Sequence, residues 1–330
     1  MRTRDLRTLP KAHLHLHLEG GMRPGTLAER AAFYGIEVPE IRGYGSFSVF
    51  ADMYVAACDV LRTDADLVRL VDETADDAVA DGAVWVEPSI YLPHHRERIG
   101  EIEHVLEVLL DAAAAATKRT GVGIGFMVAG DRTIDPADAV EQAELAAKFA
   151  GRGVVSFGLA NDEALGAPEL FAEAFAIAKD AGLLSTPHAG ELAGPESIVG
   201  ALATLSPDRI QHGVRAFELP GLVEQLADLG ICLDVCPTSN LMLAIVPTLA
   251  DHPLPRLLDA GVRCSLNGDD PLLFGPGLLD EYELVRAEMS LDDIAIASMA
   301  TASIECSGAP ADLKATALQG VVDWLGASDA

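Results

Sequence analysis

The sequence predicts an α/β protein: a single (β/α)8 TIM barrel, with eight parallel strands alternating with helices. Two observations lead to this fold. A short β-rich run, a loop and an amphipathic helical stretch recur eight times, and polar reactive residues gather at the ends of four of the runs. A doubly wound open sheet is the alternative. It is disfavoured because Glu19-Gly20-Gly21-Met22, not a glycine-rich phosphate loop, follows the first run.

The expected strands are short runs rich in β-branched and other apolar residues. They are Ala12–Leu18, Ala83–Ile90, Val122–Ala129, Val154–Ala160, Leu183–Ala189, Arg209–Val214, Ile231–Cys236 and Arg263–Leu266. The helical stretches between them are Leu67–Ala80, Ile102–Arg119, Pro136–Phe149, Pro168–Ala181, Glu196–Ala203, Glu218–Leu229 and Leu254–Asp259. Glycine is the usual stop signal of a helix, and it closes four of these stretches, at Gly82, Gly182, Gly230 and Gly261.

The chain has 330 residues, a length typical of one barrel domain spanning residues 1–330. Extra helices are expected after the first strand and at the C-terminus. The insertion between the first two strands, residues 23–63, carries Phe47, Phe50, Met53 and Tyr54 at helical spacing. These side chains either pack simply or form an apolar lid that excludes water from the barrel mouth.

A net charge of −28 would repel a phosphate backbone or an anionic membrane surface, so neither nucleic acid nor a membrane is an expected partner. No apolar run reaches the length of a membrane helix. The five cysteines are odd in number and scattered, and residues 1–7 lack the apolar core of a signal peptide. The sequence thus predicts a cytoplasmic protein and leaves its oligomeric state open, a homo-oligomer included.

Three of the nine histidines, His13, His15 and His17, alternate along the first strand. Because successive side chains of a strand point to opposite faces, we expect all three imidazoles on one face and Leu14, Leu16 and Leu18 on the other. Imidazole binds zinc, copper, iron and nickel. Three side-by-side ligands would crowd one ion, so His13 is expected to support the site or pack in the lower barrel.

Other reactive residues end later strands, where the chemistry of a barrel lies. His188 and Glu191 end the fifth, His212 lies on the sixth, and Asp269 and Asp270 end the eighth. A catalytic zinc takes about three protein ligands and a water, and the expected ligands are His15, His17, His188 and Asp269. Glu191 is then placed to move a proton, His212 to orient or deprotonate water, and Asp270 to accept a hydrogen bond from substrate.

These motifs, taken in order from residue 9 to about 275, resemble the adenosine deaminase family of the amidohydrolase superfamily. The matching segments are Leu9 to Gly20, Leu159-Ala160-Asn161-Asp162-Glu163, His188-Ala189-Gly190-Glu191, His212-Gly213, Cys236-Pro237-Thr238-Ser239-Asn240 and Ser265-Leu266-Asn267-Gly268-Asp269-Asp270-Pro271.

The resemblance implies a hydrolytic deaminase of 6-aminopurines with one Zn²⁺ per chain held by His15, His17, His188 and Asp269. It implies that Glu191 gives a proton to purine N1, that His212 assists attack on C6, and that Asp270 holds N7. Asp269 thus counts among the catalytic residues, and His17, Glu19, Asn161 and Asp270 among those that meet the substrate.

Two positions depart from adenosine-specific members of the family. Glu19 replaces an aspartate that meets the ribose 5′-hydroxyl, and Asn161 replaces a glycine whose N–H meets N3. Asn tolerates the left-handed conformation, so this N–H contact is expected to survive in a narrower pocket. Thr238 and the Asp162-Glu163 pair favour a nucleoside, adenosine, over adenine. The alternatives are aminodeoxyfutalosine, whose 5′ carbon is modified, and then adenine.

The remaining histidines, Cys236 and Asn240 are expected to have structural roles. We expect His94, His95, His104 and His252 at the surface away from the site, and Cys236 buried close to it. Asn240 is expected to hydrogen-bond its own loop.

Overall fold

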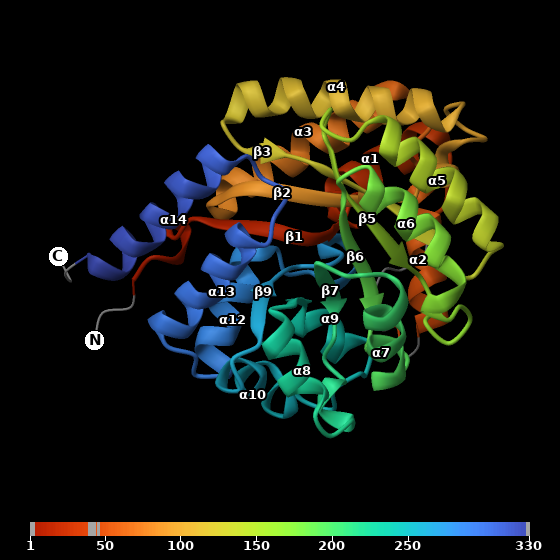
Figure 1. The fold of residues 1–330 in the computed structure, drawn as a ribbon. Helices are drawn as coiled ribbons and strands as arrows, with labels where there is room; N and C mark the ends of the chain where they lie inside the picture. Colours follow the sequence, from red (N-terminus) through yellow and green to blue (C-terminus); the bar gives the residue numbers. More distant parts are fainter. Residues whose placement is uncertain (1–3, 39–43, 45–46, 328–330) are drawn as a thin grey trace.

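The computed structural model describes residues 4–38, 44 and 47–327, and they form a parallel barrel ringed by helices, as predicted (Figure 1). The strands follow the order β1-β2-β4-β5-β6-β7-β8-β9. Their bounds are β1 (Lys11–His17), β2 (Ala83–Ile90), β3 (Gly123–Ile124), β4 (Phe126–Asp131), β5 (Val154–Ala160), β6 (Leu184–Ala189), β7 (Arg209–His212), β8 (Cys232–Val235) and β9 (Arg263–Leu266).

The third predicted strand is divided in two, which the sequence pattern does not reveal. The short β3 pairs only with β2, and β4 takes its place in the barrel. The indole of Trp85 lies against Gly123 and Gly125, where a Cβ atom would collide with the ring. Gly123 still pairs with Trp85, and the strand is interrupted at Gly125 between β3 and β4.

The barrel closes between β9 and β1 through few backbone contacts. The N–H of His17 donates to the Asp269 carbonyl at 3.0 Å, and the N–H of Asp269 donates to the His15 carbonyl at 3.0 Å. Deeper in the barrel the side chain of Asn267 completes the seam, because its Oδ1 accepts from the N–H groups of Leu14 (2.7 Å) and His15 (3.1 Å). This closure joins two segments that carry the candidate ligands.

The helices begin and end close to the predicted bounds, and Gly82, Gly182, Gly230 and Gly261 follow helices with positive φ, as expected of helix stops. The helices are α1 (Pro24–Tyr34), α2 (Phe47–Cys58), α3 (Asp64–Asp81), α4 (Ile102–Thr120), α5 (Pro136–Lys148), α6 (Ala172–Asp180), α7 (Pro195–Thr204), α8 (Leu222–Leu229), α9 (Pro237–Met242), α10 (Leu254–Asp259), α11 (Pro271–Phe274), α12 (Leu278–Glu288), α13 (Asp293–Glu305) and α14 (Ala311–Gly326).

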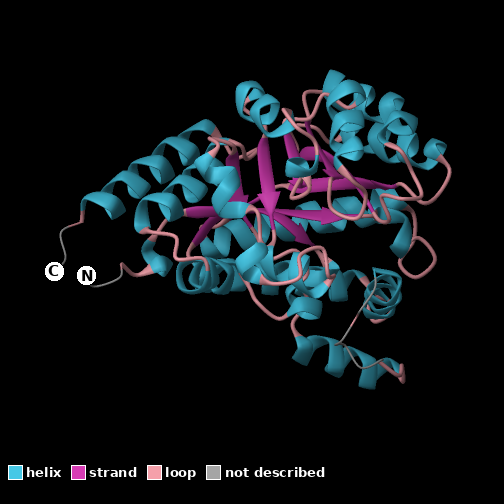
Figure 2. Cartoon of the chain, turned by 90° about the horizontal axis from the view of Figure 1, so that it is seen from below, coloured by secondary structure: helices cyan, strands magenta, loops and turns pink. Residues whose placement is uncertain are grey.

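The expected extra helices are present. Helices α1 and α2 occupy the insertion at 23–63, of which residues 39–43 and 45–46 lie outside the described residues (Figure 2). The Phe50 ring of α2 stacks on Phe274 of α11, with centroids 5.1 Å apart and planes 7° from parallel. At the C-terminus α14 packs beside the start of the chain (Figure 1), where the Trp324 indole N–H donates to the Asp5 carbonyl at 2.9 Å.

The lower half of the barrel holds a buried ionic network rather than a purely apolar core. Arg209 donates through Nη2 to Glu87 at 2.7 Å and through Nε to Asp234 at 2.9 Å, and all three side chains are fully buried. Such a network stabilises the fold only when every charge is matched, because an unpaired ion in this position is strongly disfavoured.

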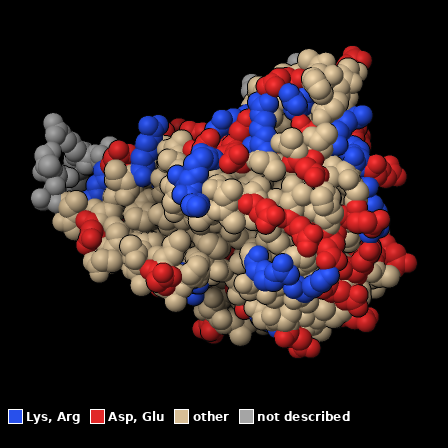
Figure 3. Space-filling view, turned by 90° about the horizontal axis from the view of Figure 1, so that it is seen from above, with Lys and Arg blue, Asp and Glu red and all other residues tan. Residues whose placement is uncertain are grey.

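The surface reflects the acidic composition, and Figure 3 shows Asp and Glu side chains spread over one face with Lys and Arg between them. In the part of the chain that the structure describes, no helix is both long and apolar enough to cross a bilayer. All five cysteines are free thiols.

Candidate active site

A bulge in β1 separates the three alternating histidines. The pairing with β2 shifts between His13, opposite Val86, and Leu16, opposite Pro88, so β1 has one more residue than its partner there. Leu14 packs with Ala12 and Trp85, while His13 and Leu16 line a separate cavity beneath α1 and α3. The prediction of three imidazoles on one face is therefore wrong, since an extra residue reverses the alternation.

His15 and His17 face the barrel mouth, whereas His13 lies behind them. The His13 Nε2 accepts a hydrogen bond from the backbone N–H of Gly268 at 3.0 Å. His13 thus supports the backbone next to Asp269 from outside the site, in line with the supporting role expected for it.

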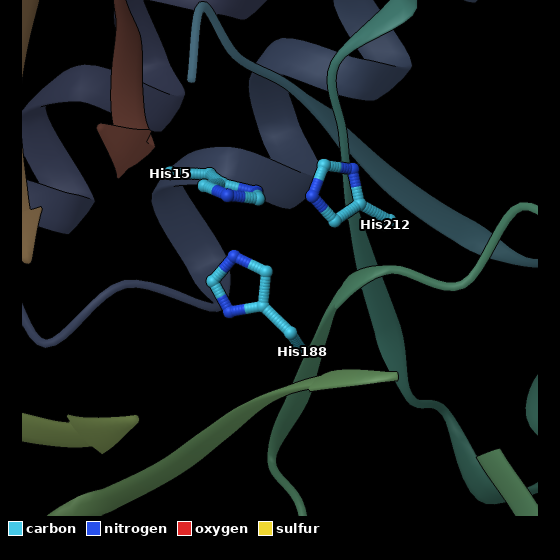
Figure 4. A group of neighbouring side chains, drawn as sticks. All are labelled: His15, His188 and His212. Carbon is cyan, nitrogen blue, oxygen red and sulfur yellow. The ribbon is translucent and has the colours of Figure 1, made fainter. Parts of the chain in front are cut away.

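The rings of His15, His188 and His212 converge from β1, β6 and β7 (Figure 4). The His15 centroid lies 4.8 Å from that of His188 and 4.6 Å from that of His212. The Nδ1 atoms are engaged elsewhere: that of His15 lies 3.1 Å from the Asp234 carbonyl oxygen, and that of His188 lies 3.0 Å from the Leu159 carbonyl oxygen. A ring that donates from Nδ1–H keeps a lone pair on Nε2, the form in which imidazole binds a metal.

Asp269 lies against this cluster at the end of β9. Its Oδ1 is 3.2 Å from the His15 Nε2 and 3.3 Å from the His17 Nε2. Burial favours the neutral acid, but the adjacent His15 and His17 outweigh it and hold the pKa of Asp269 well below its usual range. Burial, reinforced by neighbouring imidazoles, lowers the pKa values of His188 and His212 well below the ordinary value. The structure thus brings together one carboxylate and the imidazoles of four strand-end histidines, His15, His17, His188 and His212.

These residues fit a divalent transition metal. The Nε2 of His15 is buried and has no hydrogen-bond partner, although its surroundings are polar. Among the described residues, several sets of three possible ligand atoms lie here within 4.8 Å of one another. The sets are His15 with His188 and His212, His15 with Cys236 and Asp269, His17 with Asp269 and Asp270, and Glu191 with His212 and Asp269. Nitrogen donors with one carboxylate match the preference of zinc.

Glu191 stands beside the cluster as a buried acid. Its carboxyl oxygen Oε1 has no hydrogen-bond partner and lies 3.5 Å from the His212 Nε2. Burial, together with the negative charge of Asp269, raises the pKa of Glu191 well above its usual value. This environment favours the protonated acid, which is the form that can donate a proton.

The loop that carries Glu191 is held by two residues that the sequence analysis did not assign this role. Glu163 accepts from the backbone N–H groups of Gly190 (3.1 Å) and Glu191 (3.2 Å), and the buried Arg132 donates to the His188 carbonyl at 2.5 Å. Glu163 had suggested only a preference for a nucleoside. Its observed contacts are to the backbone of this loop.

His212 is oriented by a buried relay. The Asn240 Nδ2 lies 3.2 Å from the His212 Nδ1, and the Asn240 Oδ1 lies 3.2 Å from the His252 Nε2. The Asn240 side chain was expected to bond its own loop, but its partners are the side chains of two distant histidines, His212 and His252. The prediction of His252 at the surface is wrong, since the residue is 3% exposed. Cys236 is buried, with its Sγ 3.5 Å from the His15 Nδ1, as expected of a residue beside the site.

Glu19 does not line the cavity, in contrast to the role expected for it. Its Oε1 lies 2.7 Å from the His95 Nε2, and its Oε2 accepts from the Tyr54 hydroxyl at 2.6 Å. Burial alone would raise its pKa, but the hydrogen bonds from His95 and Tyr54 lower the pKa of Glu19 to about 2. The surface prediction fails for His95, which is fully buried, and for His94, which lines the cavity; it holds for the exposed His104.

The cavity above the histidines is lined by residues from the strand ends and from α2. They include His17, Phe47, Phe50, Tyr54, Ser89, Tyr91, His94, Asp131, Asn161, His188, Glu191, His212, Asp269 and Asp270. The Asp270 carboxyl oxygens are buried and have no hydrogen-bond partner. A Cβ atom at Gly20 would collide with this carboxyl group, so glycine is required there.

Three non-glycine residues of the site adopt the left-handed backbone conformation: Asn161 (φ 79°), His212 (φ 64°) and Asp269 (φ 59°). The sequence analysis anticipated this only for Asn161. The conformation is unfavourable for residues with a Cβ, and it is retained where the surrounding contacts impose it, most often at functional sites.

Glu281 of α12 is a buried acid behind the site whose ionisation is expected to destabilise the fold. It is 1% exposed, its Oε2 has no hydrogen-bond partner, and burial raises its pKa to about 8. Between about pH 4.5 and 8 the unfolded chain is ionised here and the folded chain is not, so stability falls as pH rises. The free energy of unfolding can be measured by urea denaturation at each pH. As the pH rises from about 6 to 8, this free energy should increase for E281Q relative to the native chain by at least ~1 kcal/mol. Parallel pH profiles for the two proteins would contradict this expectation.

Known proteins give the site its context. The family model described as "Adenosine deaminase" matches residues 10–324. A "Putative adenosine/adenine deaminase" of Streptomyces coelicolor is 43% identical over 98% of this chain and 99% of its own length. An "Adenine deaminase" of Rhizobium leguminosarum bv. trifolii is 38% identical over 91% of this chain and 94% of its own.

Among solved structures, an adenine deaminase from Arthrobacter aurescens superimposes with a TM-score of 0.90 at 30% identity, covering 97% of this chain and 100% of that one. The family model and these relatives span nearly the whole barrel, including every segment that carries the converging side chains. The chain belongs to the adenosine deaminase family and is a hydrolytic purine deaminase.

Proposed function

We propose that the chain deaminates free adenine to hypoxanthine and ammonia. The observation that carries this choice is the environment of Glu19. Its carboxylate is fully buried, is bound to His95 and Tyr54, and is absent from the cavity wall. A ribose 5′-hydroxyl could reach it only by displacing Tyr54. Free adenine has no ribose, so it can bind without moving Tyr54. The relatives named adenine deaminase support this reading.

The residues have distinct roles in this reaction. Glu191, protonated in its buried position, donates to purine N1 and makes C6 more electrophilic. His212 takes a proton from the attacking water, with its ring held by Asn240. Asp270 meets N7. The sequence analysis expected Asp270 to accept a hydrogen bond, but N7 carries a lone pair, so a protonated Asp270 donates; burial and Asp269 raise its pKa accordingly.

We infer that one zinc ion is held by His15, His17, His188 and Asp269. The unpartnered Nε2 of His15 and the short distances from Asp269 to two imidazoles support this set. When bound there, the ion would lower the pKa of water and supply a nucleophile at neutral pH. The chain's own contribution is the fixed orientation of the imidazoles through Asp234 and Leu159.

The apolar side chains of α2 serve as a lid in this proposal. Phe47, Phe50 and Tyr54 line the cavity from above, and Phe50 is anchored on Phe274. Their position favours the lid over simple packing, because exclusion of water strengthens the hydrogen bonds to the purine. The free thiols are consistent with a cytoplasmic enzyme acting on a small molecule.

Adenosine is the second candidate. It is favoured by the description of the matching family model and by the joint name of the Streptomyces coelicolor relative. Aminodeoxyfutalosine was the other nucleoside suggested by the altered 5′ contact. It would place a larger 5′ group where Glu19, His95 and Tyr54 already contact one another.

A substrate panel tests the proposal. With zinc-loaded protein, kcat/KM for adenine should exceed that for adenosine, 2′-deoxyadenosine and 5′-blocked adenosines by about 100-fold or more, measured by ammonia release. Equal or faster turnover of adenosine would reject adenine as the preferred substrate. Turnover of none of these 6-aminopurines would reject the assigned chemistry altogether.

A further inference from the structure

We propose that Asp131 is a specificity residue that accepts a hydrogen bond from the N9–H of free adenine and thereby distinguishes the base from a nucleoside. This inference rests on the proposed function, because it names how that site would recognise its substrate. Asp131 ends β4, lines the cavity and was not singled out in the sequence analysis.

The order of the strands around the barrel places Asp131 beside N9. Going around a purine away from C6, the nitrogens follow the order N1, N3, N9 and N7. Going around the barrel, Glu191 follows β6, Asn161 follows β5, Asp131 ends β4, and Asp270 follows β9, beyond β2 and β1. If Glu191 meets N1, Asn161 meets N3 and Asp270 meets N7, N9 faces the arc between β5 and β1. Asp131 is the carboxylate that the cavity wall presents in this arc.

The local hydrogen bonds fix Asp131 and leave it able to accept one more. Its Oδ1 accepts from the backbone N–H (2.8 Å) and the hydroxyl (2.6 Å) of Thr133, and its Oδ2 accepts from the Asn161 Nδ2 at 2.9 Å. Two carboxylate oxygens offer about four acceptor positions. Three are occupied, so one position on Oδ2 is left for a donor in the cavity.

Asn161 makes this arrangement specific to the present chain. Its left-handed backbone, with φ 79°, directs the amide side chain onto Asp131. A glycine at this position, as in adenosine-specific members of the family, has no side chain to make that bond. Of the two departures, Asn161 holds the acceptor Asp131, and Glu19, outside the cavity, binds Tyr54 of the cavity wall.

The two tyrosine hydroxyls in the same arc have partners of their own. The hydroxyl of Tyr54 donates to Glu19 and that of Tyr91 donates to Asp138 at 3.1 Å. His94 is the alternative acceptor for the N9–H, because its Nδ1 is buried with no hydrogen-bond partner. A nucleoside has carbon instead of hydrogen on N9, so it would leave this position on the half-buried Asp131 carboxylate without a donor from the substrate.

The test compares adenine with 9-methyladenine, which lacks only the N9–H, in the zinc-loaded enzyme. D131N should raise the KM for adenine about 30-fold while the affinity for 9-methyladenine, taken from its KM or from its inhibition constant against adenine, changes less than about threefold. D162N is the matched control. It removes the same charge from the same rim, and Asp162 bonds only its own loop, so both ligands should bind as before.

The outcomes separate this inference from the proposed function. Equal losses for both ligands in D131N would show a merely structural role, and no loss for adenine would show no contact; either result overturns the proposal. The same holds if H94Q, rather than D131N, shows the adenine-specific loss. Adenine turnover by the unaltered enzyme is measured in the same series, so failure of the proposed function appears there and not in the variants.

Discussion

Replacing Glu191 by Gln is expected to lower kcat for adenine by about 1,000-fold or more while leaving metal content unchanged. The amide has the same shape but cannot transfer a proton to N1, and general acid catalysis contributes about 100- to 10,000-fold. Glu191 lies 3.5 Å from His212 and is absent from the expected ligand set, so zinc binding should persist. The measurement is steady-state ammonia release together with metal content per chain.

The matched control for this variant is E173Q. Glu173 lies on the exposed face of α6 and touches no cavity residue, so its loss should leave kcat unchanged. If E191Q turned over adenine at the rate of the unaltered enzyme, Glu191 would not be the proton donor. If E191Q also lost its metal, the side chain would belong to the metal site instead.

Replacing Arg209 by Met should lower the free energy of unfolding by about 3–5 kcal/mol, enough to deplete the folded protein. Arg209 is fully buried between Glu87 and Asp234, and its removal leaves two carboxylates without a counter-charge. The effect should extend to the site. The Asp234 carboxylate accepts from Ser265 at 2.7 Å, Ser265 accepts from Asn267 at 2.8 Å, and Asn267 holds the His15 backbone.

Urea denaturation monitored by circular dichroism measures this loss, and a triple variant provides the control. Combining R209M with E87Q and D234N removes all three charges, so it should recover a large part of the stability lost in R209M. A change of less than about 0.5 kcal/mol in R209M would mean that the network does not stabilise the barrel.

The barrel and the convergence of its reactive residues could be predicted because both follow from regular periodicity. Parallel strands end at one rim, so His188, Glu191, His212 and Asp269 had to meet once each strand was located. The same reasoning failed inside β1, where strict alternation placed His13 beside His15. One extra residue opposite β2 turns His13 to the other face. A bulge is determined by the pairing partner, and a single strand pattern does not contain that information.

Contacts between residues far apart in the sequence also could not be predicted. His95 and Glu19 are separated by 76 residues and form a buried pair, and Asn161 reaches Asp131 across 30 residues. The sequence indicates substrate contacts for Glu19 and Asn161, but it does not identify His95 and Asp131 as their partners. Their contacts depend on how η3, a turn at Leu92–His95, and the ends of β4 and β5 come together over the mouth. This tertiary arrangement, rather than the motifs, shifted the proposed substrate from adenosine to adenine.

Titration of metal-free protein with zinc tests the central claim most directly. The claim is that His15, His17, His188 and Asp269 form one metal site on which purine deamination depends. Ammonia release from adenine should rise in proportion to added zinc and stop rising at one equivalent per chain, with H15A binding less than about a tenth of an equivalent and remaining inactive. Full activity of the metal-free protein, or a plateau only at two equivalents, would contradict the claim.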